Sequence, residues 1–197
     1  MYLKRTIDIV VSALMLLVAL PIFLIIAVAI VLDSGFPVLY SQRRVGRQFQ
    51  EFELLKFRSM QVCNGGSPIT VKGDKRITRV GRILRIAKLD EIPQLWNVLW
   101  GDMSLVGPRP ELPEYVNLFR DRYKRVLAVR PGVTDLASIC FRNEEEILSR
   151  SQEPLRNYVE AVLPIKLDLA DEYIRKRSLW LDLQILAKTL IVVLRFV

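Results

Sequence analysis

The stretch IVVSALMLLVALPIFLIIAVAIVL, residues 9–32, holds no charged side chain. A helix of about 24 residues rises about 36 Å, which exceeds the roughly 30 Å of hydrocarbon in a bilayer. The apolar part of a cleaved signal peptide is shorter, about 7–15 residues. The stretch therefore predicts a helix that is inserted in a membrane.

Features within and around this stretch favour a helix that enters and leaves the membrane on the same side. Pro21 lacks a backbone donor and opposes the carbonyl of Leu17, so we expect a kink there. Positive charge marks cytoplasmic flanks, and basic residues lie on both sides of the stretch: Lys4, Arg5, Arg43, Arg44 and Arg47. These features predict a re-entrant helix, with a kinked membrane-spanning helix as the alternative.

The composition combines apolar character with an excess of positive charge. Hydrophobic residues make up 51% of the 197 residues, and 29 Lys and Arg outnumber 21 Asp and Glu, which gives a net charge of +8. Anionic headgroups attract Lys and Arg near a membrane by about 1 kcal/mol per residue. Nucleic acid would account for the charge but not for the apolar stretch, so the expected partner is membrane lipid and not nucleic acid.

Histidine is absent from the sequence, which excludes a histidine general base, a Ser–His or Cys–His nucleophile and most zinc sites. Two cysteines, Cys63 and Cys140, are too few for a disulfide framework and predict free thiols in a reducing compartment. Neither a P-loop nor a Rossmann glycine fingerprint is present. The chemistry must therefore rest on carboxylates, Lys, Arg and an oxygen-bound cation.

The remaining sequence predicts a helix-rich α+β fold with a small β-hairpin and amphipathic helices at the membrane interface. The final segment is amphipathic and suits either the membrane interface or the protein core. The predicted elements are β-prone runs at 38–43 and 51–58 flanking a turn at 45–48, a mobile loop at 61–78, a β-prone stretch at 134–141, and helices at 80–88, from Asp90 onward, at 112–127, at 155–177 and at 179–197.

Asp90 and Glu91 open one of these helices, where acidic residues commonly cap free N–H groups. A helix cap is thus one interpretation. Basic residues surround the pair, as would suit a bound phosphate: Arg82, Arg85, Lys88 and Arg109. A carboxylate with an ordinary pKa near 3.9 is ionised at pH 7 and needs no activating base. Phosphoryl transfer depends mainly on positioning and charge neutralisation, so a phosphoryl-transfer site is the second interpretation.

The segment Ser104–Glu111 reads SLVGPRPE and places Arg109 between Pro108 and Pro110. Because proline fixes the backbone, we expect the segment to present the guanidinium group in a defined place. The alternative is a rigid turn in which Arg109 pairs locally with Glu111.

Four motifs occur in an order that resembles the bacterial sugar transferase family: KFRSM at 56–60, LDEIPQ at 89–94, SLVGPRPE at 104–111 and RPGVT at 130–134. More narrowly, the chain is similar to the small monotopic phosphoglycosyl transferases, from Lys4 through residues 179–183. The resemblance implies transfer of a sugar-1-phosphate from a nucleotide diphosphate sugar, such as a UDP-sugar, to polyprenyl (undecaprenyl) phosphate, with release of UMP. It also implies a role in starting glycoconjugate assembly.

In that family the Asp of the Asp–Glu pair attacks the β-phosphate of the donor and forms a covalent phosphosugar ester. The resemblance assigns this attack to Asp90, proton or metal handling to Glu91, and Mg²⁺ binding to Asp90. The implied substrate contacts are Lys56, Arg58, Arg85, Pro108, Arg109, Pro110 and Glu111, with a supporting role for Asp168. A non-catalytic membrane scaffold of a glycosylation complex is the alternative function.

The resemblance further implies a re-entrant helix that is broken at a Ser-Pro pair and anchored by basic residues, here Pro21 with Lys4 and Arg5. Leu20 replaces the usual Ser, so the hydroxyl that could satisfy the freed carbonyl is missing. This departure leaves the choice between a re-entrant and a spanning helix open.

The expected organisation is a membrane-inserted segment, 1–37, followed by a catalytic domain, 38–197, with interfacial helices. We expect the domain on the cytoplasmic face of the bacterial inner membrane, with a homodimer as an open alternative to a monomer. A second departure from the family follows Thr134, where the sequence reads DLASICFRN at 135–143. It bears on which donor sugar is preferred.

Overall fold

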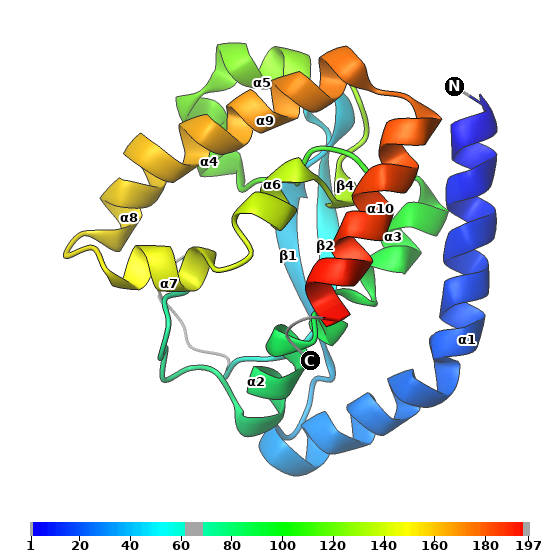
Figure 1. The fold of residues 1–197 in the computed structure, drawn as a ribbon. Coiled ribbons are helices and arrows are strands. Elements are labelled where there is room, and N and C mark those ends of the chain that lie inside the picture. Colours follow the sequence, from blue (N-terminus) through cyan, green and yellow to red (C-terminus); the bar gives the residue numbers. More distant parts are fainter. Residues whose placement is uncertain (1, 62–68, 195–197) are drawn as a thin grey trace.

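A computed structural model describes residues 2–61 and 69–194, and the fold is rich in helices with two small sheets (Figure 1). The predicted helix-rich α+β class is confirmed. The helices after the N-terminal helix α1 (Tyr2–Ser34) are α2 (Arg79–Ile86), α3 (Gln94–Trp100), α4 (Pro113–Leu118), α5 (Arg120–Val126), α6 (Leu136–Cys140), α7 (Glu144–Ser149), α8 (Pro154–Asn157), α9 (Leu163–Lys176) and α10 (Leu179–Leu194).

Helix α1 is long and apolar enough to cross a membrane. Its most apolar 18-residue stretch has a mean hydropathy of 3.2, and only 11% of that stretch is buried in the rest of the protein. Pro21 lies inside the helix, and Figure 1 shows α1 changing direction partway along its length. The buried residues of α1 lie toward its two ends: Asp8, Ser12, Ile26 and Ile30. The middle of α1 is therefore largely exposed, while its ends pack on α3, β3 and α2.

The predicted β-hairpin is confirmed. Strand β1 (Leu39–Val45) pairs antiparallel with β2 (Glu51–Phe57), and Tyr40 lies opposite Lys56. A short 3₁₀ turn, η1 (Arg47–Phe49), lies between the strands. The open end of the hairpin carries Lys56, whereas its turn lies at the far end of the pair.

A second sheet joins two of the sequence motifs. Strand β3 (Ser104–Val106) pairs in parallel with β4 (Gly132–Thr134). The β-prone stretch predicted at 134–141 was wrong beyond Thr134, because α6 begins at Leu136. Asp135 stabilises this helix start, since its carboxylate accepts a hydrogen bond from the Ser138 N–H at 2.7 Å.

Other predicted helices are present with interruptions. The helix expected at 112–127 is divided at Phe119, where φ is −119°, into α4 and α5. The helix expected at 155–177 consists of α8, a π-helical segment η3 (Tyr158–Val162) and α9. Residues 62–68 of the predicted mobile loop lie outside the described residues.

Helix α10 packs one side on the body through Asp182 and Ile185, so part of it belongs to the core. Its exposed large hydrophobic residues are Leu179, Trp180, Leu183, Leu190, Ile191 and Leu194, and its placement at a membrane interface stays a prediction.

One hydrophobic cluster ties together the elements that carry the candidate site. It includes Leu54 of β2, Val98 of α3, Val106 of β3 and Ile185 of α10, all of them buried. Because protein interiors are close-packed and transmit displacements, this shared core fixes the turn before α3 relative to the loop after β3.

Candidate active site

Asp90 and Glu91 lie on a 3₁₀ turn, η2 (Leu89–Glu91), between α2 and α3. The preceding residue, Lys88, has a left-handed backbone with φ of 56°, which is strained for a side chain without special tolerance. The prediction that a helix begins at Asp90 was wrong, since α3 begins at Gln94 and the Asp90 side chain forms no cap hydrogen bond. The turn instead buries Asp90, which is 5% exposed.

Glu91 is held between two cations. Its Oε1 accepts hydrogen bonds from Arg109 Nη2 at 2.5 Å and from Lys56 Nζ at 3.0 Å, and its Oε2 lies 3.4 Å from Arg109 Nη1. Lys56 comes from β2 and Arg109 from the loop after β3. The turn, the hairpin and the loop therefore meet at one carboxylate, and we call Lys56, Asp90, Glu91 and Arg109 the dyad cluster.

The environment separates the two carboxyl groups in acidity. Burial alone would raise the pKa of Glu91, but Arg109 and Lys56 outweigh it and hold that pKa well below its usual range. For Asp90, burial together with the charge of Glu91 raises the pKa against the opposing charge of Lys56. The expectation of an ordinary Asp90 pKa is thus corrected. A proton that binds this pair resides on Asp90.

Asp90 has a buried oxygen, Oδ1, without a hydrogen-bond partner among the described residues. An ionised carboxylate oxygen that is left without a partner is costly to bury, so it is a candidate for contact with a ligand or cation. No group of three acidic, His or Cys side chains that could hold a metal occurs in the described part of the chain. A cation here would need ligands from a substrate as well.

The loop that carries Arg109 is fixed by a close approach of two glycines. A Cβ added to Gly132 would lie 2.1 Å from the nitrogen of Gly107, so only glycine fits there. Gly132 N donates to Pro108 O at 2.9 Å, and Arg109 N donates to Asp135 Oδ2 at 3.1 Å. The SLVGPRPE and RPGVT motifs therefore form one structural unit that presents the Arg109 guanidinium group to Glu91.

Glu111 does not pair with Arg109, so the local ion pair considered for the SLVGPRPE segment is wrong. Glu111 is buried and accepts hydrogen bonds from Arg44 Nη1 at 2.8 Å and from the Tyr158 hydroxyl at 2.6 Å. Arg44 Nη1 also donates to Pro110 O at 3.2 Å. These contacts place Glu111 and Pro110 in the support of the loop, and their contact with a substrate stays a prediction.

Two other predicted substrate contacts, Arg85 and Arg58, have hydrogen-bond or ion-pair partners outside the dyad cluster. Arg85 of α2 pairs with Glu145 of α7, and its charge only partly offsets the rise in the pKa of Asp90 that burial causes. Arg58 is buried and donates to Ser34 Oγ at 2.9 Å and to Phe36 O at 2.7 Å, which ties β2 to the end of α1.

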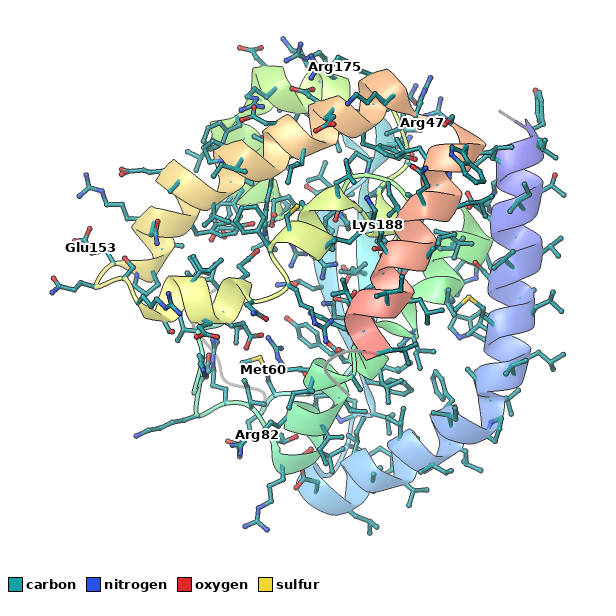
Figure 2. The ribbon with its side chains drawn as sticks, in the orientation of Figure 1. Arg47, Met60, Arg82, Glu153, Arg175 and Lys188 are labelled. Atoms are coloured by element: carbon teal, nitrogen blue, oxygen red, sulfur yellow. The ribbon has the colours of Figure 1, made fainter. Side chains whose placement is uncertain are left out.

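Asp168 is remote from these contacts. Its side chain is 71% exposed and pairs with Arg122 at 2.6 Å on the α5 and α9 side, and no described contact joins it to the dyad cluster. Of the basic residues that were expected around the pair, Arg82 is exposed on α2 (Figure 2).

Lys4 and Arg5, predicted as membrane anchors, bind the protein itself. Lys4 Nζ lies 2.6 Å from Asp182 Oδ2 of α10. Arg5 donates to the carbonyls of Val98 and Leu99 at 2.6 and 3.0 Å, which satisfies the C-terminal end of α3. Anchoring to headgroups stays a prediction for both residues.

Sequence reasoning missed Asn97, which docks α3 on β2. Its amide is fully buried, accepts from Leu55 N–H at 3.0 Å and donates to Glu53 O at 2.8 Å. These bonds satisfy the free edge of the strand that carries Lys56. The only signal in the sequence was a polar residue between the apolar residues Leu95, Val98 and Leu99.

Comparison with known proteins gives consistent matches over nearly the whole chain. The family model described as "Bacterial sugar transferase" matches residues 1–196. The UDP-glucose:undecaprenyl-phosphate glucose-1-phosphate transferase of Caulobacter vibrioides is 39% identical over 94% of this chain and 67% of its own length.

Two further relatives differ in the sugar that they are named for. The undecaprenyl-phosphate galactose phosphotransferase of Salmonella typhimurium is 36% identical over 98% of this chain and 41% of its own length. The UDP-N-acetylgalactosamine-undecaprenyl-phosphate N-acetylgalactosaminephosphotransferase of Aeromonas hydrophila is 37% identical over 96% of this chain and 43% of its own length. The chain thus spans less than half the length of these two relatives.

Proposed function

The chain belongs to the bacterial sugar transferase family, and we propose that it transfers a sugar-1-phosphate from a UDP-sugar to undecaprenyl phosphate and releases UMP. The observation that carries the proposal is the buried Asp90, which has one oxygen without a hydrogen-bond partner among the described residues, beside a Glu91 that two cations hold. The names of three relatives, which act on glucose, galactose and N-acetylgalactosamine donors, support the reaction class and leave the sugar open.

In the proposed reaction an oxygen of Asp90 attacks the β-phosphorus of the UDP-sugar. The bond from that phosphorus to the bridging oxygen breaks, and UMP leaves with the electron pair. An oxygen of undecaprenyl phosphate then attacks the same phosphorus, the bond to Asp90 breaks, and the electron pair returns to the carboxylate. Each half of the reaction is a phosphoryl transfer that depends on positioning and on neutralising phosphate charge.

Glu91 serves this reaction by positioning cations. Arg109 and Lys56 are 31% and 22% exposed while they bind Glu91, so each retains donors that can face a diphosphate. Fixed cations of this kind stabilise developing phosphate charge without reorganisation at the moment of reaction. Because the pKa of Glu91 is low, its carboxylate stays anionic at neutral pH and keeps its ion pairs with Arg109 and Lys56.

The residues fit Mg²⁺ as a partner of Asp90. Mg²⁺ in phosphoryl-transfer sites is usually bound by one or two carboxylates plus substrate phosphates, and Asp90 Oδ1 is a buried acceptor that no residue in the described part of the chain contacts by a hydrogen bond. When bound, Mg²⁺ neutralises charge on the diphosphate. Thermal unfolding with UDP tests this: Mg²⁺ should raise the melting temperature of the wild type further, and should not do so for Asp90→Asn.

The covalent step is tested without the acceptor. Wild-type protein incubated with UDP-sugar and Mg²⁺ should gain the mass of one phosphosugar, and Asp90→Asn should gain none and release no UMP. Asp121→Asn makes the same change at an exposed carboxylate on α5 and should behave as the wild type. An adduct on Asp90→Asn would exclude Asp90 as the nucleophile. Absence of UMP release with every donor would favour the scaffold alternative.

We also propose that α1 is re-entrant and that the catalytic domain lies on the cytoplasmic face. The start of α1 is bonded to the body through Lys4 and Arg5, and its end through Arg58, which donates to Ser34. A folded body cannot lie in hydrocarbon, so both ends of α1 belong on its side of the membrane. The exposed apolar middle of the helix then enters the bilayer.

Cysteine labelling tests this topology. Cys140 of α6 is exposed on the body and reports which side the catalytic domain faces. A cysteine at the exposed Tyr2 position, in a Cys63→Ser/Cys140→Ser background, should react with an impermeant maleimide from the same side as Cys140 does in a Cys63→Ser background. Reaction of the two positions from opposite sides would establish a spanning helix.

A further inference from the structure

A cavity of about 320 Å³ lies away from the dyad cluster. It forms where the start of α1, the hairpin turn, the segment before β4 and the junction of α9 with α10 meet, and Figure 2 shows Arg47 beside that junction. Its volume is within the range of small-molecule sites. The lining residues with charged side chains are Lys4, Arg5, Asp8, Arg47, Arg130, Arg177 and Asp182.

The cavity carries uncompensated positive charge. Five cations and two carboxylates line it, and Lys4 pairs with both carboxylates, Asp182 at 2.6 Å and Asp8 at 3.8 Å. Arg47 and Arg177 form no ion pair or side-chain hydrogen bond within the described ranges, and Arg47 Nε is buried without a partner. Two guanidinium groups from separate elements therefore face the same cavity with donors that an anion could use.

This cavity is distinct from the candidate active site. Arg47 follows β1 at the turn of the hairpin, whereas Lys56 lies near the open end of the hairpin. Glu51 and Lys56 are five positions apart in β2, which corresponds to about 17 Å along the strand. None of the residues of the dyad cluster lines the cavity.

Apolar side chains line the cavity alongside Arg47 and Arg177. Val106, Val129 and Leu179 line the cavity, and exposed apolar side chains continue from it along the start of α1 and α10, at Leu3, Ile7 and Trp180. A purely aqueous anion would gain nothing from this surface, whereas a phosphate group attached to acyl chains would use both parts.

We propose that this cavity binds the phosphate group of an anionic membrane lipid, with the lipid chains lying along the exposed face of α1. The proposal rests on the membrane orientation of α1 given above and not on the transfer reaction. The bound lipid would join the hairpin turn to the α9–α10 junction beside the point where α1 leaves the body.

Native mass spectrometry of the full chain in neutral detergent, titrated with short-chain phosphatidylglycerol, tests the proposal. One guanidinium group near an anionic headgroup contributes about fivefold in affinity, so the Arg47→Gln/Arg177→Gln variant should bind the lipid about thirtyfold more weakly. Arg175→Gln/Lys75→Gln removes the same charge from exposed positions outside the cavity and should bind as the wild type. Circular dichroism and thermal unfolding verify folding, and Arg177→Gln alone, at an exposed position, should give about a fivefold loss.

Competition separates the sources of phosphate. Inorganic phosphate and short-chain phosphatidylcholine should displace the lipid only at much higher concentration. The proposal would be overturned if the folded wild type, Arg177→Gln and Arg47→Gln/Arg177→Gln all bound the lipid equally well. It would also be overturned if inorganic phosphate displaced the lipid at the same concentration as unlabelled lipid does. Asp90→Asn should retain lipid binding, so a failure of the transfer reaction and a failure of this site give different results.

Discussion

Replacing Glu91 by Gln removes the one negative charge that Arg109 and Lys56 share at 2.5 and 3.0 Å. Loss of one partner from a buried ion pair costs about 3–5 kcal/mol, because it leaves uncompensated buried charge. Arg109 and Lys56 are 31% and 22% exposed, so solvent screening lowers the expected loss of unfolding free energy to about 2–3 kcal/mol. For a chain of this size the melting temperature should fall by roughly 4–12 °C.

A double-mutant cycle measures this interaction directly. Glu91→Gln, Arg109→Gln and the double variant are unfolded in the same detergent, and we expect a coupling energy of about 1–3 kcal/mol. Asp121→Asn, which removes an exposed carboxylate, should change stability by less than about 0.5 kcal/mol. A coupling energy below about 0.5 kcal/mol would refute the assignment of Glu91 as the group that positions Arg109.

Gly132→Ala should abolish UMP release and lower the unfolding free energy by several kcal/mol, because its Cβ would lie 2.1 Å from Gly107 N; a variant with wild-type melting and turnover contradicts the glycine contact. Asn97→Ala should cost about 2–4 kcal/mol in thermal unfolding, since it removes hydrogen bonds to two backbone groups of β2, and a loss below 0.5 kcal/mol, roughly the noise of a surface change, argues against docking of α3. Burial and Glu91 both raise the pKa of Asp90, so kcat/KM should fall as the pH drops through a value above the usual 3.8. This acid limb should move to lower pH in Glu91→Gln, and a shift to higher pH would exclude Asp90 as its source.

Local sequence patterns were sufficient to predict those elements whose conformation depends mainly on neighbouring residues. The uncharged stretch around Pro21 predicted a long apolar helix, and the alternation on either side of Val45–Gln48 predicted the hairpin. The β-prone prediction for the stretch after Thr134 was wrong. The Asp135 carboxylate accepts a capping hydrogen bond from the Ser138 N–H, and this helix start outweighs the β propensity of the neighbouring residues. The predicted start of the next helix at Asp90 was also wrong. The left-handed backbone of Lys88 leads into a 3₁₀ turn at Leu89–Glu91, so α3 begins only at Gln94.

The partners of charged side chains required the tertiary structure. One of the two predictions for Arg109 was an ion pair with its neighbour Glu111, whereas Arg109 binds Glu91, 18 residues earlier in the sequence. Arg58, predicted to contact the substrate, donates to Ser34 at the end of α1, and Lys4 pairs with Asp182. An ion pair forms wherever the fold brings opposite charges together, and separation along the chain gives no measure of that proximity.

The sequence alone gives the side chains available for chemistry, namely no histidine, an acidic pair at 90 and 91 and many cations, together with one long apolar segment. The fold sets which carboxylate is held as an anion and which keeps an oxygen without a hydrogen-bond partner within the described ranges. Both residues have nearly the same intrinsic acidity, and their difference arises from burial and from the distances to Lys56 and Arg109. Those distances are set by β2, α3 and the Gly107–Gly132 contact, which meet only in the folded chain.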